Sequence, residues 1–232
     1  MCYEIITITN LNTYKKRIIM SCIHKFNNKT DFKGLIPKWD FDKLVIGTFN
    51  PSNDFHESNT ANFFYQRKKN YFWDVFPLFH NSKPIPKDNV NLQKSFLKSN
   101  RIGITDILTS INDADKNISN HIQFISTVKD DDLEKFSSFN WNTKNIINII
   151  DENRVKEVYF TKLGLADQIN VKENTFEFQI RLIENYCSKN NIYNKRLHSP
   201  TGMGLGKGKR VETLKNRWEN NGILYHPPLD SK

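Results

Sequence analysis

Two loops of this chain combine side chains that can carry out proton or hydrogen-bond chemistry with glycine and proline. The first reads Gly-Thr-Phe-Asn-Pro-Ser-Asn-Asp and places Asn50 and Asp54 shortly after Gly47. Glycine lets a ligand approach the backbone and proline fixes the turn, so an amide or a carboxylate here would face a pocket. Asn-Pro also begins ordinary turns, so this loop alone does not establish a site.

The second loop begins at His198, continues Ser-Pro-Thr-Gly-Met-Gly-Leu-Gly-Lys-Gly, and ends on Lys209 and Arg210. It combines a hydrogen-bond donor, exposed backbone amides and a cationic end. The glycines do not form a phosphate-binding P-loop. Three residues rather than four separate Gly202 from the Gly206-Lys207 pair, and a glycine follows where Ser or Thr would bind magnesium.

Aromatic residues precede a basic turn between these loops. Phe63, Phe64 and Tyr65 are adjacent, and Asn70 stands where it can cap the next helix. Three large neighbouring rings do not all fit against one core, so we expect at least one of them at a cleft, where aromatic faces stack on unpaired bases. The rings that follow have the spacing of the core face of a helix; they are Phe72, Trp73, Phe76 and Phe79.

The elements that must position these loops alternate between strands and helices. Predicted strands are Lys43 to Phe49, Ile102 to Leu108, Val155 to Thr161 and Asn194 to His198. Predicted helices are Tyr71 to Phe79, Asn91 to Lys98, Asp131 to Phe136, Thr143 to Glu152, Thr175 to Lys189 and Lys209 to Asn220. This alternation predicts an α/β fold, a three-layer α/β/α sandwich with a central, mainly parallel four-stranded sheet. Ligands bind beyond the carboxyl ends of such strands, where both loops lie.

Residues 1–40 do not fit this alternation. They contain a candidate strand at Glu4 to Thr9 and a basic stretch at Lys15 to Arg17. We therefore expect an N-terminal extension over residues 1–40 and one domain over 41–232.

The composition indicates the type of partner. A net charge of +9 favours a polyanion such as nucleic acid, although Lys and Asn are abundant throughout this chain. Three scattered cysteines provide neither a disulfide framework nor a four-thiolate metal site. No apolar run is long enough to cross a membrane, and no signal peptide is evident. We expect a cytoplasmic monomer without metal or other cofactor and without membrane association.

Taken in order, the Gly-x-x-Asn-Pro loop, the aromatic run with Asn70-Tyr-Phe-Trp, and His198-Ser-Pro-Thr resemble the uracil-DNA glycosylase superfamily over about Lys43 to Trp218. Mismatch-specific and single-strand-selective members carry Gly-x-Asn-Pro and Asn-x-Phe-Trp. Hypoxanthine-DNA glycosylases carry a Phe-Tyr-Tyr-like stretch similar to Phe63-Phe64-Tyr65 and a strand similar to Ile102 to Leu108. Iron-sulfur members need four cysteines, so that branch is excluded.

The resemblance implies an enzyme that flips a deaminated base, uracil or hypoxanthine, out of DNA and hydrolyses its N-glycosidic bond. It implies that Asn50 orients water or binds the base edge, and that His198 donates to the oxyanion of the departing base. Predicted base-binding residues are Gly47, Phe49, Phe64, Tyr65, Asn70 and Ser199. Predicted DNA-binding residues are Ser52, Thr201, Gly202, Met203, Lys207, Lys209 and Arg210. Met203 or Leu205 could be a wedge between bases or an anchor to the core.

Two departures from the family pattern leave alternatives open. Asn50 is the third residue after Gly47, where members usually have the second, so Phe49 could occupy its place. Asp54, Asp106 or Asn112 then becomes the candidate for water activation. His198 could be a structural substitute for proline. The competing functions are a catalytically inactive DNA-binding module on the same fold and, least favoured, a nucleotide-binding α/β enzyme.

Overall fold

The computed structural model describes residues 21–164, 171–202, 204–206 and 208–226 of the chain. Its centre is a four-stranded parallel sheet in the order β5-β4-β8-β9. The strands are β1 (Cys22–Ile23), β2 (Phe32–Lys33), β3 (Ile36–Pro37), β4 (Lys43–Gly47), β5 (Ile102–Asp106), β6 (Leu108–Ile111), β7 (Phe139–Trp141), β8 (Glu157–Phe160) and β9 (Tyr193–Arg196).

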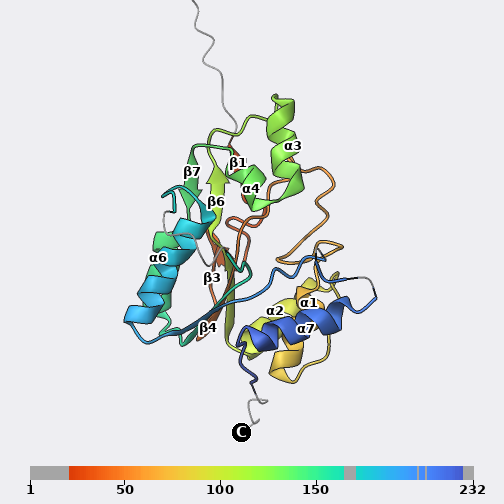
Figure 1. The fold of residues 1–232 in the computed structure, drawn as a ribbon, viewed down its shortest axis with the longest axis vertical. Coiled ribbons are helices and arrows are strands. Elements are labelled where there is room, and N and C mark those ends of the chain that lie inside the picture. Colours follow the sequence, from red (N-terminus) through yellow and green to blue (C-terminus); the bar gives the residue numbers. More distant parts are fainter. Residues whose placement is uncertain (1–20, 165–170, 203, 207, 227–232) are drawn as a thin grey trace, which may run out of the picture.

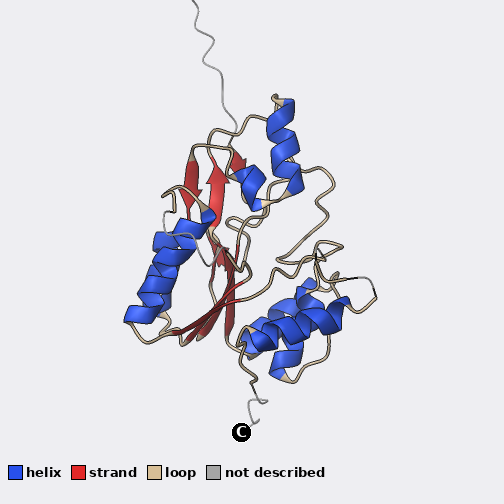
Figure 2. Ribbon diagram, in the orientation of Figure 1, coloured by secondary structure: helices blue, strands red, loops and turns tan. Residues whose placement is uncertain are grey.

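The helices of the described residues are α1 (Phe72–Val75), α2 (Val90–Ser99), α3 (Ser119–Thr127), α4 (Asp130–Leu133), α5 (Thr143–Glu152), α6 (Phe176–Lys189) and α7 (Arg210–Asn220). A 3-10 helix, Phe76–His80, continues α1 directly. Helices α1, α2 and α7 lie on one side of the sheet and α6 on the other (Figures 1 and 2).

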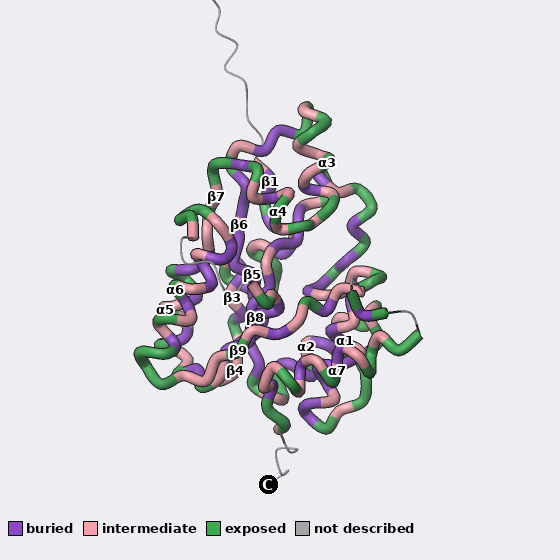
Figure 3. Tube along the Cα trace, in the orientation of Figure 1, coloured by how far each residue is buried: buried purple, intermediate pink, exposed green. Residues whose placement is uncertain are grey.

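The two helical layers follow from the alternation of side chains along the buried strands. Leu44 and Ile46 of β4 face the cluster that contains residues of α5 and α6, whereas Val45 between them faces the cluster of α1, α2 and α7. Both faces of a parallel sheet are covered in such folds, so its central strands are apolar throughout. Figure 3 shows these strands buried between exposed outer surfaces. The sandwich expected from the sequence is therefore present.

The predicted elements all occur, and the structure adds the helix α3 and the short strands β1, β2, β3, β6 and β7. All four predicted strands and all six predicted helices occur, with ends displaced by a few residues, and α5 has the predicted bounds. The second predicted strand divides after Asp106. Its continuation, β6, leaves the parallel sheet and pairs with β1 and β7 in a small antiparallel sheet. The helix α3 was not predicted.

Residues 21–40, which the sequence assigns to an extension, pack against the rest of the fold. β1 pairs with β6, and β2 pairs with β3. Phe26, Phe32 and Leu35 are buried in the cluster of α1 and α2. The candidate strand at Glu4 to Thr9 and the basic stretch at Lys15 to Arg17 lie outside the described residues.

Helices in the described part of the chain are all too short or too polar to cross a membrane.

Candidate functional site

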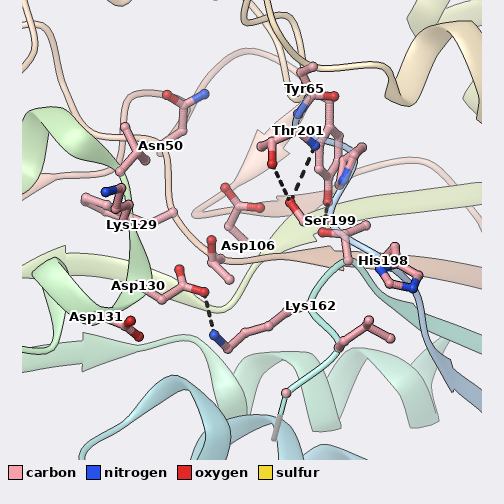
Figure 4. Close-up of a pocket in the computed structure, with 18 of the residues that line it drawn as sticks. Asn50, Tyr65, Asp106, Lys129, Asp130, Asp131, Lys162, His198, Ser199 and Thr201 are labelled. Atoms are coloured by element: carbon pink, nitrogen blue, oxygen red, sulfur yellow. Dashed lines mark hydrogen bonds and ion pairs between the residues drawn. The ribbon is translucent and has the colours of Figure 1, made fainter. Parts of the chain in front are cut away.

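A cleft of about 1150 Å³ lies beyond the carboxyl ends of the parallel strands. The chain order of the sheet reverses between β4 and β8, and this switch point is where α/β sheets bind ligands. Residues of both sequence-predicted loops line the cleft, among them Asn50 and His198. In the view of Figure 4, Asp106 lies between Asn50 on one side and Tyr65 and Ser199 on the other.

Asp106, at the end of β5, is a buried carboxylate of the cleft that a histidine holds in place. It is 5% exposed, and its Oδ2 accepts a hydrogen bond of 2.7 Å from Nε2 of His24. The Phe26 backbone N–H donates to Nδ1 of His24 at 3.1 Å. Since Nδ1 is an acceptor, Nε2 carries the proton and His24 holds the carboxylate in one orientation. Among the described residues no hydrogen bond reaches Oδ1 of Asp106, so this oxygen can accept a proton.

Tyr65 stands beside this carboxylate in a constrained conformation. Its φ is +59°, its ring stacks on Phe72 at 4.2 Å, and its hydroxyl lies 3.0 Å from Oγ1 of Thr161 at the end of β8. Burial, and next the charge of Asp106, raise the pKa of Tyr65 well above its ordinary value. Tyr65 is therefore a neutral hydrogen-bonding wall of the cleft.

Gly47 makes room for both side chains. A Cβ at this position would lie 2.2 Å from Oδ1 of Asp106 and 2.7 Å from the Tyr65 hydroxyl. Gly47 is not itself in the lining of the cleft. Its part in the site is to let Asp106 and Tyr65 approach the end of β4.

Asn50 lines the opposite wall and is 7% exposed. Its Oδ1 accepts hydrogen bonds from Nδ2 of Asn59 at 2.6 Å and from the guanidinium of Arg67 at 3.0 Å. A guanidinium only donates, so this oxygen is assigned without ambiguity and both its lone pairs are used. Asn50 is left with its amide N–H groups, which makes it a donor to a ligand rather than an acceptor of a proton from water.

His198 also lines the cleft, from the loop after β9. Burial, and next the charge of Arg217, lower its pKa, so the ring is neutral near pH 7 and can donate one hydrogen bond. Its backbone carbonyl accepts from the Trp218 indole at 2.8 Å. Backbone contacts hold this loop against the segment before α1. Asn70 and Thr201 form a β-bridge, and the Tyr71 N–H donates to the Pro200 carbonyl at 2.8 Å.

The glycine-rich loop is held from both ends. Leu205 is 2% exposed and packs in the core cluster, so of the two interpretations the anchor is the one observed. Arg210 donates to the Tyr71 hydroxyl at 2.9 Å and to the Gly206 carbonyl at 3.1 Å. Lys209 is exposed and outside the lining. Met203 and Lys207 lie outside the described residues.

The remaining predicted site residues divide into three groups. Phe49, Phe64, Ser199 and Gly202 line the cleft, although Phe64 is almost wholly buried. Asn70 lies in the lining, but its Oδ1 accepts a hydrogen bond from the N–H of Phe72, the first residue of α1. Asp54, Ser52 and Asn112 are outside the lining. Asp54 is exposed in a turn at the end of the first loop, so of the three carboxylate or amide alternatives only Asp106 reaches the cleft.

One wall of the cleft is acidic. Asp130, Asp131 and Glu134 line it from α4 and the residue after it. Lys162 pairs with Asp130 at 2.7 Å, as Figure 4 shows. Burial raises the pKa of Glu134, whose Oε1 accepts from the Phe176 N–H at 2.8 Å. Lys129 and Lys162 line the cleft beside these carboxylates and partly neutralise them, and Arg67, Lys69 and Arg210 are further cations of the lining.

Two residues of the site were not singled out by the sequence. His24 falls in the segment assigned to an extension, and Arg67 is one of three cations in a basic turn. Asp106 carried a usable signal, because it stands near the carboxyl end of a predicted strand. Within the described residues, no group of three His, Cys, Asp or Glu side chains could hold a metal ion.

No protein-family model matches the chain, and no curated protein aligns significantly with it. The likeness to the uracil-DNA glycosylase superfamily therefore remains an expectation from the sequence motifs.

Proposed function

We propose that this protein is a DNA glycosylase that hydrolyses the N-glycosidic bond of a flipped-out deaminated base. The observation that carries the proposal is the His24–Asp106 pair, a buried and oriented carboxylate in a cleft large enough for a nucleotide. The net charge of +9 and the motif resemblance support DNA as the substrate.

Cleavage of a glycosidic bond places positive charge on the sugar and negative charge on the departing base. The Asp106 carboxylate stabilises the cationic sugar and takes a proton from water through Oδ1 as the water oxygen bonds to C1′. The electron pair of the C1′–N bond leaves with the base. One amide N–H of Asn50 and neutral His198 supply hydrogen bonds to the base anion.

Phe49 and Tyr65 provide the aromatic surfaces for a flipped base, as both line the cleft. The Phe49 ring packs edge-on against His24, with ring centroids 5.5 Å apart, which fixes it beside the carboxylate. In this proposal Asp106 takes the water-activating role for which Asn50 and Asp54 were the first candidates, because the Asn50 carbonyl is already used and Asp54 lies outside the cleft.

The test is base release from single- and double-stranded oligonucleotides that carry one uracil or hypoxanthine, with alkaline cleavage of abasic sites as the readout and no added metal. Asp106→Asn can still accept from His24 but is a poor base, so we expect release to slow by about 10² to 10⁴-fold with DNA affinity retained. Asp88→Asn, an exposed carboxylate outside the cleft, is the matched control and should not change the rate.

Absence of abasic product from every lesion would overturn the proposal. DNA binding that persists without any product would favour the inactive DNA-binding module instead.

A further inference from the structure

Arg67 is a partly buried guanidinium without an anionic partner. Its only hydrogen bond among the described residues goes to Oδ1 of Asn50 at 3.0 Å, and no carboxylate of those residues lies within ion-pair distance. Arg101 and Arg196, in contrast, are paired with carboxylates. Burial lowers the pKa of Arg67 to about 10, although the charge of Asp106 across the cleft opposes this effect.

Two further bases stand close to Arg67. The Lys25 ammonium donates to the Asn59 carbonyl at 2.6 Å and has no carboxylate partner in the described part of the chain. Burial, and then the charges of Arg67 and Lys29, lower its pKa. The pKa of His56 is lowered by burial and by the charges of Arg67 and Lys25. The fold thus holds like charges near one another without an anion between them.

The hydrogen-bonding groups left free on the Arg67, Lys25 and Asn50 side chains are all donors. A guanidinium has five N–H groups and an ammonium three, and in Arg67 and Lys25 one of each is used. The Asn50 carbonyl is satisfied by Asn59 and Arg67, which leaves the two N–H groups of its amide. Asn59 connects the two cations. Its backbone carbonyl accepts a hydrogen bond from the Lys25 ammonium, and its side-chain amide donates to the Asn50 oxygen that also accepts from Arg67.

Partly buried cations without a partner cost free energy, and a bound anion recovers it. Guanidinium forks match the oxygens of phosphate, and an ammonium adds charge without a fixed geometry.

We propose that Arg67, Lys25 and the Asn50 amide form a binding site for a phosphate group beside the base pocket. The site stands on the contacts above, and the choice of a DNA backbone phosphodiester as its source rests on the proposed function. A terminal phosphomonoester is the other source of the same chemistry.

The test measures affinity for a lesion-free duplex by fluorescence anisotropy over a series of KCl concentrations. Lesion-free DNA separates this proposal from the proposed function, because no base is released. Arg67→Gln and Lys25→Gln should each weaken binding about tenfold at low salt and reduce the slope of log K against log salt by about 1. Arg67→Lys, which keeps the charge and a donor to Asn50, should fall between wild type and Arg67→Gln.

Lys189→Gln is the control that removes the same charge elsewhere. Lys189 is the last residue of α6, and the chain enters β9 shortly after it. Lys189 therefore lies near the amino ends of the parallel strands, whereas the cleft lies beyond their carboxyl ends. At physiological salt its loss should change affinity by about twofold or less, because distant charges are screened.

A second arm adds inorganic phosphate and follows thermal unfolding. If the source is a monoester, phosphate should raise the Tm of the wild type but not of Arg67→Gln, and the salt slope for DNA should stay unchanged. Unaltered binding of both duplex and phosphate in Arg67→Gln, Arg67→Lys and Lys25→Gln would overturn the proposal. These side chains would then serve only to hold the turn between Asn50 and Asn59.

Discussion

Gly47 leaves no space for a side chain, because the atoms around it belong to fixed groups. Oδ1 of Asp106 would lie 2.2 Å from a Cβ at this position, and Asp106 is held by His24. We expect Gly47→Ala to lower the free energy of unfolding by about 1 to 3 kcal/mol and to suppress base release, since the carboxylate must turn away. Urea unfolding and the oligonucleotide assay measure the two effects.

A double-mutant cycle isolates the cause. In an Asp106→Ala background the colliding carboxylate is gone. Gly47→Ala should therefore lower the free energy of unfolding clearly less than it does in the wild type. If Gly47→Ala lowers the free energy of unfolding equally in the two backgrounds, its strain does not come from contact with Asp106.

The sequence predicted the residues of the site unevenly. Asn50 reaches the cleft because it follows the buried strand β4, which the hydrophobic pattern marks, whereas His198 follows the polar strand β9, which only the alternation of elements marks. Asp106 emerged only as an alternative, and His24 not at all. Its pairing with Asp106 joins residues 82 positions apart, and such a contact depends on the register of β1 against β6. No local pattern specifies that register.

The glycine-rich loop before α7 is anchored to the core by one buried side chain. Leu205 is 2% exposed between glycines with φ of +73° on either side. We expect Leu205→Ala to lower the free energy of unfolding by about 2 to 4 kcal/mol, because it leaves a cavity beneath α7. Val211→Ala, at an exposed position early in α7, should change it by less than about 0.5 kcal/mol.

The same variants distinguish an anchor from a wedge. A wedge inserted into DNA would contribute to affinity and not to folding. Leu205→Ala that unfolds like the wild type but binds DNA more weakly would therefore reverse the assignment.

The elements themselves were largely predictable, whereas their pairing was only partly so. Apolar runs bounded by polar turns indicated β4, β5 and β8, and helical spacing indicated α5 and α6. The polar strand β9 was predictable only from the alternation of elements, and as an edge strand it has less apolar surface to bury. The departure of β6 into a second sheet follows from tertiary pairing with β1 and β7, which the local sequence does not encode.

The free energy of unfolding depends on pH through His80. It is 5% exposed and stacks on His226, with ring centroids 4.7 Å apart. Burial, followed by the charges of His226 and Lys43, lowers its pKa to about 3. The unfolded chain binds a proton near pH 6.5, so below that pH the unfolded state holds more protons and stability falls as the pH falls.

His80→Phe keeps a ring against Phe76 and Phe96 but cannot be protonated. Between pH 7 and pH 5 the wild type should lose up to about 2 kcal/mol more than this variant in urea unfolding. Identical pH dependence in the two proteins would contradict the assignment.

The domain organisation shows the limit of composition as a guide. Residues 21–40 have few strand or helix signals, yet Phe26, Phe32 and Leu35 are buried in the common core. Short β1, β2 and β3 strands are stabilised by what they contact rather than by their own length, so a sequence pattern does not reveal them.

The hydrogen bond from the Trp218 indole to the His198 carbonyl has a consequence for folding during synthesis. Synthesis proceeds from the N-terminus, and His24, Asn50 and Asp106 emerge from the ribosome long before the last strand. The wall that contains His198 is fixed only when α7 has been translated and has packed on the sheet. A nascent chain therefore carries its carboxylate without a finished cleft, and competence to engage a ligand arrives in one late step.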